Sequence, residues 1–405
     1  MPKLPGWLRK PFLGKPPRTP KVAISWQLHE GFGWGLVGVH TALYLAEHGR
    51  PPLLATEPDW QALRAGNRER LASLEGVATQ VNELLGLHAP NPVVLEEFVV
   101  LHALFARFIA FPMSQRLRGG RNVGLLALED TLLDEPSVQR ARTYDRVVVH
   151  STYNREVLAA HGIDAGLALQ GVDPTEMAPQ PRRGRFAGRF VVFSGGKLEH
   201  RKGHDIVVAA FTRFHRRHPE ALLATAWENL WPKSAGGLAA STLAPVAPTL
   251  DEHGQLRLRD WALANGVPAH AFLDLGHLDR DQIAPTLAEC DAAVFPNRCE
   301  GATNLVAMEA MACGVPSVVS ANTGHLDIVD DGRCIVLRDQ RPVPDPTGSM
   351  VGWGESSVDE LVEALESLYT DRAAARARAA KAVEFFRTQR TWRQFAQQLV
   401  AQLPA

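Results

Sequence analysis

Short apolar runs recur along the chain and alternate with longer segments in which apolar residues repeat at helical spacing. Near-continuous apolar runs are typical of parallel strands that are covered on both faces, and their alternation with helices predicts an α/β protein with doubly wound sheets. In the first half of the chain the predicted strands are 21–26, 53–56, 98–101, 123–126 and 146–149. A glycine-containing loop, 31–35, follows the first strand and leads into a helix that Gly49 ends.

A second unit of the same kind begins near Phe190, after the proline-rich stretch 178–184. Its predicted strands are 190–193, 221–225, 272–275, 292–295 and 316–319. The C-terminal segments with helical patterns are 358–369, 372–386 and 391–403. The chain is therefore expected to form two similar doubly wound, Rossmann-like domains, joined near residues 178–188.

Residues 1–20 differ from the rest of the chain, because they are basic and proline-rich and contain no acidic side chain. The prolines prevent a long helix. We interpret this segment as an arm that lies on the surface of the first domain. The alternative is peripheral contact of its basic and apolar residues with an anionic membrane surface.

The overall composition narrows the class of protein further. The chain has 405 residues, of which 21% are charged, and a formal net charge of −1, so it is globular and a nucleic-acid partner is not expected. Its four cysteines include no Cys-x-x-Cys pair, which indicates free thiols in a reducing compartment. No apolar run reaches the ~18 residues of a membrane span. We expect a cytoplasmic protein, or one at the inner face of a membrane.

The most informative motif runs from residue 295 to residue 316. A strand ends there, a loop carries Glu300, and Asn304 is a suitable N-cap for a helix that starts near Leu305. The free N–H groups of a first helical turn suit a diphosphate, and Glu309, one turn further on, suits a ribose diol. The simpler alternative is a capped helix with a surface glutamate.

A basic loop, 195–203, follows the strand that begins at Phe190. Gly196 allows close approach of the backbone, and Lys197, Arg201 and Lys202 concentrate positive charge that suits a phosphate-bearing ligand and its departure. A basic loop is more often a solvated surface, but this one lies where doubly wound sheets bind ligands. The earlier loop 31–35 is not a P-loop and matches only the start of a dinucleotide-binding fingerprint.

These motifs, in this order and together with Gly171-Val172-Asp173 and Cys290-Asp291, resemble the retaining GT-B-fold glycosyltransferases of family 4, also called glycosyltransferase group 1. The resemblance spans nearly the whole chain after the arm. It implies two Rossmann-like domains that face each other across a cleft. Residues 21–180 would bind the acceptor and 186–385 the nucleotide sugar, and 386–405 would form a helix that packs back on the first domain.

The resemblance also implies roles for individual residues. Glu300, His102 and Lys202 would be catalytic: Glu300 touches the sugar, His102 orients the sugar or the acceptor, and Lys202 neutralises the departing diphosphate. The donor-binding residues would be Gly33, Gly196, Lys197, Lys202, Gly276, Asn304, Leu305 and Glu309. Lys197 stands where the family usually has arginine, and eight residues rather than seven separate Glu300 from Glu309. A lone histidine such as His102 is otherwise more often structural, but its position directly after the predicted strand 98–101 favours a functional role.

The implied activity is transfer of a hexose-type unit from a nucleoside-diphosphate sugar to a glycan, lipid-linked or small-molecule acceptor, in bacterial surface glycan synthesis for example. Neither a metal nor another cofactor is implied, and the anomeric configuration would be retained. The alternatives are another GT-B enzyme, such as a phosphorylase or an epimerase, and a degenerate GT-B protein used for binding. A dehydrogenase is a more distant alternative.

Overall fold

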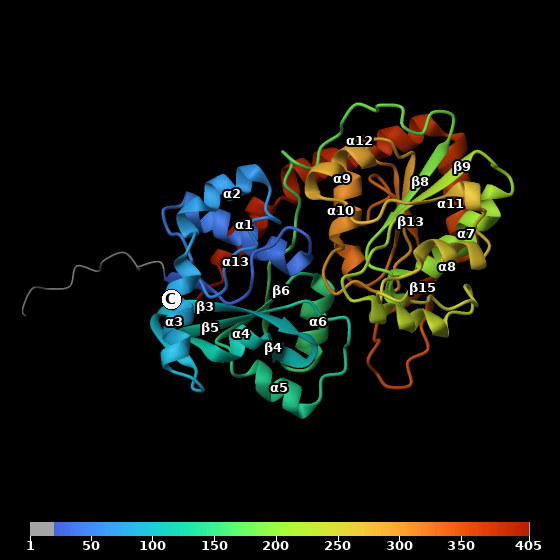
Figure 1. The fold of residues 1–405 in the computed structure, drawn as a ribbon. Helices are drawn as coiled ribbons and strands as arrows, with labels where there is room; N and C mark the ends of the chain where they lie inside the picture. Colours follow the sequence, from blue (N-terminus) through green and yellow to red (C-terminus); the bar gives the residue numbers. More distant parts are fainter. Residues whose placement is uncertain (1–19, 405) are drawn as a thin grey trace, which may run out of the picture.

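The structure, a computed structural model, describes residues 20–404, and residues 1–19 of the predicted arm lie outside the described part. Figure 1 shows two α/β lobes, the first in blue to green together with the red C-terminal helix, and the second in green to red. Each lobe is built around its own mainly parallel sheet. The prediction of two doubly wound domains is confirmed.

The first domain has a seven-stranded sheet in the order β2-β1-β3-β5-β6-β7, and β4 is added antiparallel to β3. Its strands are β1 (Lys21–Ile24), β2 (Leu53–Leu54), β3 (Val93–Phe105), β4 (Ile109–Ala110), β5 (Leu117–Leu126), β6 (Arg146–Val149) and β7 (Ala165–Leu167). Its helices are α1 (Gly33–Glu47), α2 (Ala65–Leu71), α3 (Val77–Leu87), α4 (Pro112–Arg116), α5 (Glu135–Ala141) and α6 (Thr152–Ala160).

The second domain has a six-stranded parallel sheet in the order β10-β9-β8-β11-β12-β13. Its strands are β8 (Phe190–Gly195), β9 (Ala221–Ala226), β10 (Phe272–Asp274), β11 (Ala292–Phe295), β12 (Ser317–Ser320) and β13 (Ile335–Leu337), and β14 (Gln340–Pro342) pairs with β15 (Gly354–Ser356) in an antiparallel ribbon. The remaining helices are α7 (His204–His215), α8 (Leu258–Ala264), α9 (Arg280–Leu287), α10 (Leu305–Ala312), α11 (Val358–Thr370), α12 (Arg372–Gln389) and α13 (Trp392–Val400).

Successive side chains of β8 point to opposite faces of the sheet. Helices cover both faces, so the strand is apolar throughout. Phe190 and Val192 face the core formed with α7, α8 and α11, whereas Val191 and Phe193 face the core formed with α9, α10 and α12. Both faces of the sheet are therefore covered by helices, and the short parallel strands end at a common edge where ligands bind in doubly wound sheets.

The connection between the domains lies earlier in the chain than the predicted linker. Val172 forms a parallel β-bridge with Thr391, so the outgoing and returning segments cross side by side. Residues of the predicted linker are already bound to the second domain, since Arg182 Nη1 lies 2.9 Å from Asp291 Oδ1. After the return crossing, α13 packs against α1 of the first domain, where the ring of Trp392 stacks on His40 at a centroid distance of 4.8 Å.

The strand predicted at 98–101 is longer than expected. β3 continues to Phe105 because Ala103 and Leu104, beyond His102, are also apolar and buried. His102 is therefore inside the strand, paired in register with Gly124 of β5, and not at its end. β7 and β13 were not predicted, although β10, which has the same length of three residues, and the shorter β2 were.

Candidate functional site

A cavity of about 390 Å³ lies between the two domains, at the ends of their sheets. The first domain contributes Gly33, Trp34, Glu129, His150 and Gln170, among others, and the second contributes Gly196, Lys197, Arg201, Lys202, Gly276, Glu300, Asn304, Leu305 and Glu309. The cavity thus brings together the predicted donor-binding residues and two of the three predicted catalytic ones, Glu300 and Lys202. A smaller space of about 220 Å³ shares Glu309 and extends toward His29 and Arg280.

The start of α10 forms one wall of the cavity. Asn304 has a left-handed backbone, with φ 59°, which asparagine tolerates better than most residues, and its side chain accepts a 3.3 Å hydrogen bond from the N–H of Ala307. His325 Nε2 accepts a 2.9 Å bond from the Asn304 amide and so holds the cap. The N–H groups of the first two residues of α10, Leu305 and Val306, have no acceptor within the helix and can donate to an anion.

Gly33, at the start of α1, faces α10 from the other domain. A Cβ atom at Gly33 would lie 3.5 Å from Cδ1 of Leu305, so the two helix starts are in near contact across the cavity. Both residues line it. A phosphate placed here would meet two helix N-termini, which carry partial positive charge.

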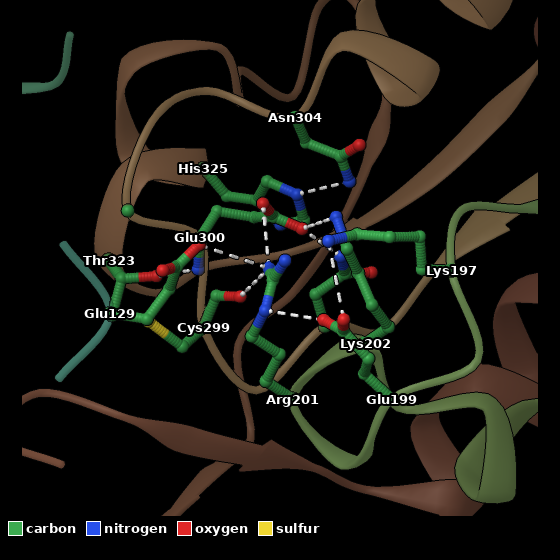
Figure 2. A network of polar contacts seen from close by, with 12 residues as sticks. Glu129, Lys197, Glu199, Arg201, Lys202, Cys299, Glu300, Asn304, Thr323 and His325 are labelled. Atoms are coloured by element: carbon green, nitrogen blue, oxygen red, sulfur yellow. Dashed lines mark hydrogen bonds and ion pairs between the residues drawn. The ribbon is translucent and has the colours of Figure 1, made fainter. Parts of the chain in front are cut away.

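The carboxylate of Glu300 is the centre of a buried network of charges (Figure 2). Its Oε1 accepts hydrogen bonds from Lys202 Nζ, at 2.5 Å, and from the side-chain amide of Asn297. Its Oε2 lies 3.3 Å from Nη1 of Arg201. Burial alone would raise the pKa of Glu300, but Lys202 and Arg201 outweigh burial and lower this pKa to about 2. Glu300 is therefore ionised and paired at neutral pH.

The backbone around Glu300 is held by its neighbours in space. The N–H of Glu300 donates to Thr323 Oγ1 at 2.9 Å, and its carbonyl accepts from the N–H of Gly324 at 2.9 Å. Two residues earlier, the buried guanidinium of Arg298 makes bonds of 2.8 and 2.7 Å to the carboxylate of Asp205 on α7. These contacts position the Glu300 loop before any ligand binds.

Arg201 connects Glu300 to two further carboxylates. Its Nε lies 2.9 Å from Glu199 Oε2, and its Nη1 lies 3.5 Å from Glu129 Oε1. Glu129 follows β5 of the first domain, so this ion pair crosses the cavity. Figure 2 shows how Arg201 extends between Glu199 and Glu300. Arg201 was recognised in the sequence only as part of a basic loop, and Glu129 was not singled out.

The glycines of the basic loop are required by its geometry. Gly196 has φ +105°, and Gly203, with φ +69°, has its α-carbon so close to Pro296 that a Cβ atom would lie 2.2 Å from the Pro296 carbonyl oxygen. Both conformations disfavour other residues. The loop therefore turns tightly and aims Lys202 at Glu300, while Lys197 Nζ lies 3.3 Å from Glu199 and 4.8 Å from the centre of the Trp231 ring.

Glu309 belongs to a different cluster of charges. Its carboxylate forms a close ion pair with Arg280 of α9, and Nη2 of Arg280 lies 3.3 Å from Glu176 Oε2. Glu176 in turn pairs with Arg64, which comes from the first domain. Burial raises the pKa of Glu176, although Arg280 and Arg64 oppose this effect. Arg280 was missed in the sequence, because nothing in its local pattern shows that it neutralises Glu309.

The structure does not bring His102 to the cavity. Its ring is buried in the first domain, where Nε2 is 3.0 Å from the side-chain oxygen of Asn122. Burial lowers its pKa to about 4, against the effect of this bond. The expectation of a strand-end position for His102 is wrong, because the apolar run of β3 continues past it. A histidine of the same sheet that does line the cavity is His150, which directly follows β6.

Groups outside this network give few further candidates. Cys290, Cys299, Cys313 and Cys334 are buried free thiols. Within residues 20–404, no three His, Cys, Asp or Glu side chains converge as metal ligands would. None of the helices in that range is long and apolar enough to cross a bilayer.

Comparisons with known proteins agree on one group. A family model described as "Glycosyl transferases group 1" matches residues 179–384. The GDP-mannose-dependent alpha-(1-6)-phosphatidylinositol monomannoside mannosyltransferase of Mycolicibacterium smegmatis is 29% identical over 249 residues, which are 57% of this chain and 55% of that protein. Glycogen synthase of Mycobacterium tuberculosis is 28% identical over 310 residues, or 72% and 64%. The matches thus span less than two thirds of either relative.

Solved structures share the two-domain arrangement. Sucrose-phosphate synthase from Thermosynechococcus elongatus superposes with a TM-score of 0.61 at 15% identity, covering 93% of this chain and 96% of that one. The Anabaena protein HepE, in complex with UDP and glucose, superposes with a TM-score of 0.62 at 14% identity, covering 94% and 98%. At these identities the likeness establishes the fold.

Proposed function

The chain belongs to the group 1 glycosyl transferases and has their GT-B fold, and on this basis we propose that it transfers a hexose-type unit from a nucleoside-diphosphate sugar to an acceptor. The observation that carries the proposal is the interdomain cavity, which is lined by the start of α10 and by the buried carboxylate of Glu300 with its partners Lys202 and Arg201. Positive groups of this kind match a diphosphate, and a fixed negative charge matches a sugar carbon that becomes cationic.

In this proposal the donor lies along the cavity from Glu309 to Glu300. Glu309 accepts hydrogen bonds from the ribose, and the diphosphate rests on the N–H groups at the start of α10 and on Lys197. The bond from the sugar carbon to the diphosphate oxygen breaks, and the electron pair leaves with the diphosphate. Lys202 neutralises the growing charge, while Glu300 stabilises the positive charge on the sugar. The fixed cations make a metal ion unnecessary.

The family number, the stereochemistry of transfer, the acceptor and the location are proposed from the family resemblance. We propose membership of family 4 and retention of anomeric configuration, with the acceptor hydroxyl attacking the same face from which the diphosphate leaves and giving its proton to the departing diphosphate oxygen. The first domain would hold a glycan, lipid-linked or small-molecule acceptor. We also propose a cytoplasmic location or one at the inner face of a membrane, and a role in bacterial surface glycan synthesis. The name of the mannosyltransferase and a HepE structure in complex with UDP-glucose suggest GDP-mannose and UDP-glucose as the first donors to try.

A panel of nucleotides tests the proposal directly. Thermal unfolding of the full chain is measured with UDP, GDP and ADP and with UDP-glucose, GDP-mannose and ADP-glucose. A ligand that binds the native state raises the melting temperature, so one base should give a clear shift with both its diphosphate and its sugar form. Slow release of the diphosphate from that donor distinguishes an enzyme from a binding protein. No shift with any of the six compounds contradicts the proposal.

A further inference from the structure

Lys197 differs from the other two cations of the basic loop in the way its side chain is held. The side chains of Lys202 and Arg201 are 10% and 16% exposed and pair with Glu300, whereas the side chain of Lys197 is 37% exposed. A lysine carries its charge on a flexible stem and lacks the fork geometry of the arginine that the family usually has at this position. Lys197 therefore needs other contacts to keep its charge in one place.

Two side chains flank the ammonium group of Lys197. Its Nζ lies 3.3 Å from Oε1 of Glu199, an ion pair that is drawn in Figure 2. The same atom lies 4.8 Å from the centre of the Trp231 ring, which is the distance of a cation–π contact. Lys197 and Trp231 both line the cavity, and within residues 20–404 no other cation–π pair has both members in its lining.

The loop that carries Trp231 is fastened to the basic loop. The N–H of Trp231 donates a 2.9 Å hydrogen bond to the side-chain oxygen of Asn229. The buried amide group of Asn229 donates in turn, at 3.3 Å, to the carbonyl of Leu198, the residue after Lys197. Trp231 is thus held beside Lys197 by a direct link between the two loops, although 56% of its surface is exposed.

We propose that Trp231 is a positioning residue for the diphosphate site: its ring holds the ammonium group of Lys197 at the cavity and limits the pairing of this group with Glu199. The inference rests on the proposed glycosyl transfer and deepens it, because it explains how a lysine can serve where the family usually has arginine. Without the ring, Glu199 remains as the flanking group and draws the ammonium group to itself. A phosphate would then have to compete with Glu199 and to order a freer lysine side chain.

A double-mutant cycle of Trp231 and Lys197 separates this role from a merely structural one. Trp231→Leu removes the aromatic face and keeps an apolar side chain, and Lys197→Met removes the charge and keeps the stem. Calorimetry with UDP, GDP and ADP measures diphosphate affinity in the wild type, both single variants and the double variant. Phe385→Leu is the control, since Arg333 lies 3.8 Å from the centre of the Phe385 ring and neither residue lines the cavity.

We expect Trp231→Leu to weaken binding of the diphosphate about three- to tenfold, the size of a lost cation–π contact. In the Lys197→Met background the same substitution should change the affinity by less than about twofold, because the cation that it acts through is gone. Trp231→Phe, which keeps an aromatic face, should retain most of the affinity, and Phe385→Leu should bind like the wild type.

Two results would overturn the proposal. One is unchanged or tighter diphosphate binding in Trp231→Leu, and the other is an equal loss of affinity with and without the charge of Lys197. If the wild type binds none of UDP, GDP and ADP, the proposed function itself fails, and this inference with it.

Discussion

The two glutamates that line the cavity, Glu300 and Glu309, belong to different clusters of charges and are held in different ways. Glu300 is paired with two cations, Lys202 and Arg201, and its backbone is fixed on both sides. Glu309 is paired with Arg280, which it shares with Glu176. The charge of Glu300 is thus in place before a ligand arrives, as electrostatic preorganisation requires. Glu309 must share its contacts with any ribose that enters, so its contribution is expected in binding.

The largest expected effect that tests this difference comes from Glu300→Gln. The substitution keeps the shape but removes the charge that would stabilise a positive sugar carbon. We expect kcat to fall about 10²–10³-fold, with the affinity for free nucleoside diphosphate nearly unchanged. Initial rates with the full donor and calorimetry with the diphosphate measure the two quantities.

Glu199→Gln is the matched comparison for Glu300→Gln. It removes a carboxylate from the same Arg201, but Glu199 is not among the residues that line the cavity. Its loss of kcat should be clearly smaller. Equal losses in both variants, or a loss of diphosphate affinity in Glu300→Gln, would show that Glu300 does not face the sugar.

The second effect concerns the binding of the nucleoside diphosphate at Glu309. Glu309→Ala should weaken free nucleoside diphosphate binding and raise the donor KM with little change in kcat, because a ribose contact is made equally in ground and transition states. The loss is expected at about 1.5–3 kcal/mol for one charge-assisted hydrogen bond. Glu176→Gln, which changes the other partner of Arg280 without lining the cavity, should affect binding less.

The third effect is on stability in acid. The pKa of Glu300 in the folded protein, about 2, lies below its usual value of 4.5. Ionised Glu300 therefore contributes stability above pH 4.5, and this contribution is lost as the pH falls from 4.5 toward 2. In Glu300→Gln the loss of stability that comes from protonation of Glu300 should be absent. The difference in unfolding free energy between the wild type and this variant should therefore shrink below pH 4.5. A constant difference down to pH 2 would contradict the depressed pKa.

The sequence predicts the sheets of both domains, and the residues that it singles out between 300 and 309 line one cavity in the structure, for physical reasons. Strands covered on both faces are apolar throughout, and Glu300, Asn304 and Glu309 are close in sequence and therefore close in space. Pairs distant in sequence leave no local trace: Arg298 meets Asp205, and Arg280 meets Glu176, only in the folded chain. The position of His102 was predicted wrongly, because a polar residue after an apolar run is typical of a strand end, whereas β3 continues to Phe105.

The last prediction is that divalent metal ions have no effect on donor turnover. Around the proposed diphosphate position Lys197, Lys202 and the start of α10 supply fixed positive charge, and each lines the cavity. Because these groups need no reorganisation when charge develops on the leaving group, donor turnover should be the same with EDTA and with added Mg²⁺ or Mn²⁺. Lys202→Met sharpens the test: it removes one fixed cation beside Glu300, so turnover should fall while EDTA still has no effect. Turnover that EDTA abolishes in the wild type, and that Mn²⁺ restores, would mean that the side-chain cations are not sufficient.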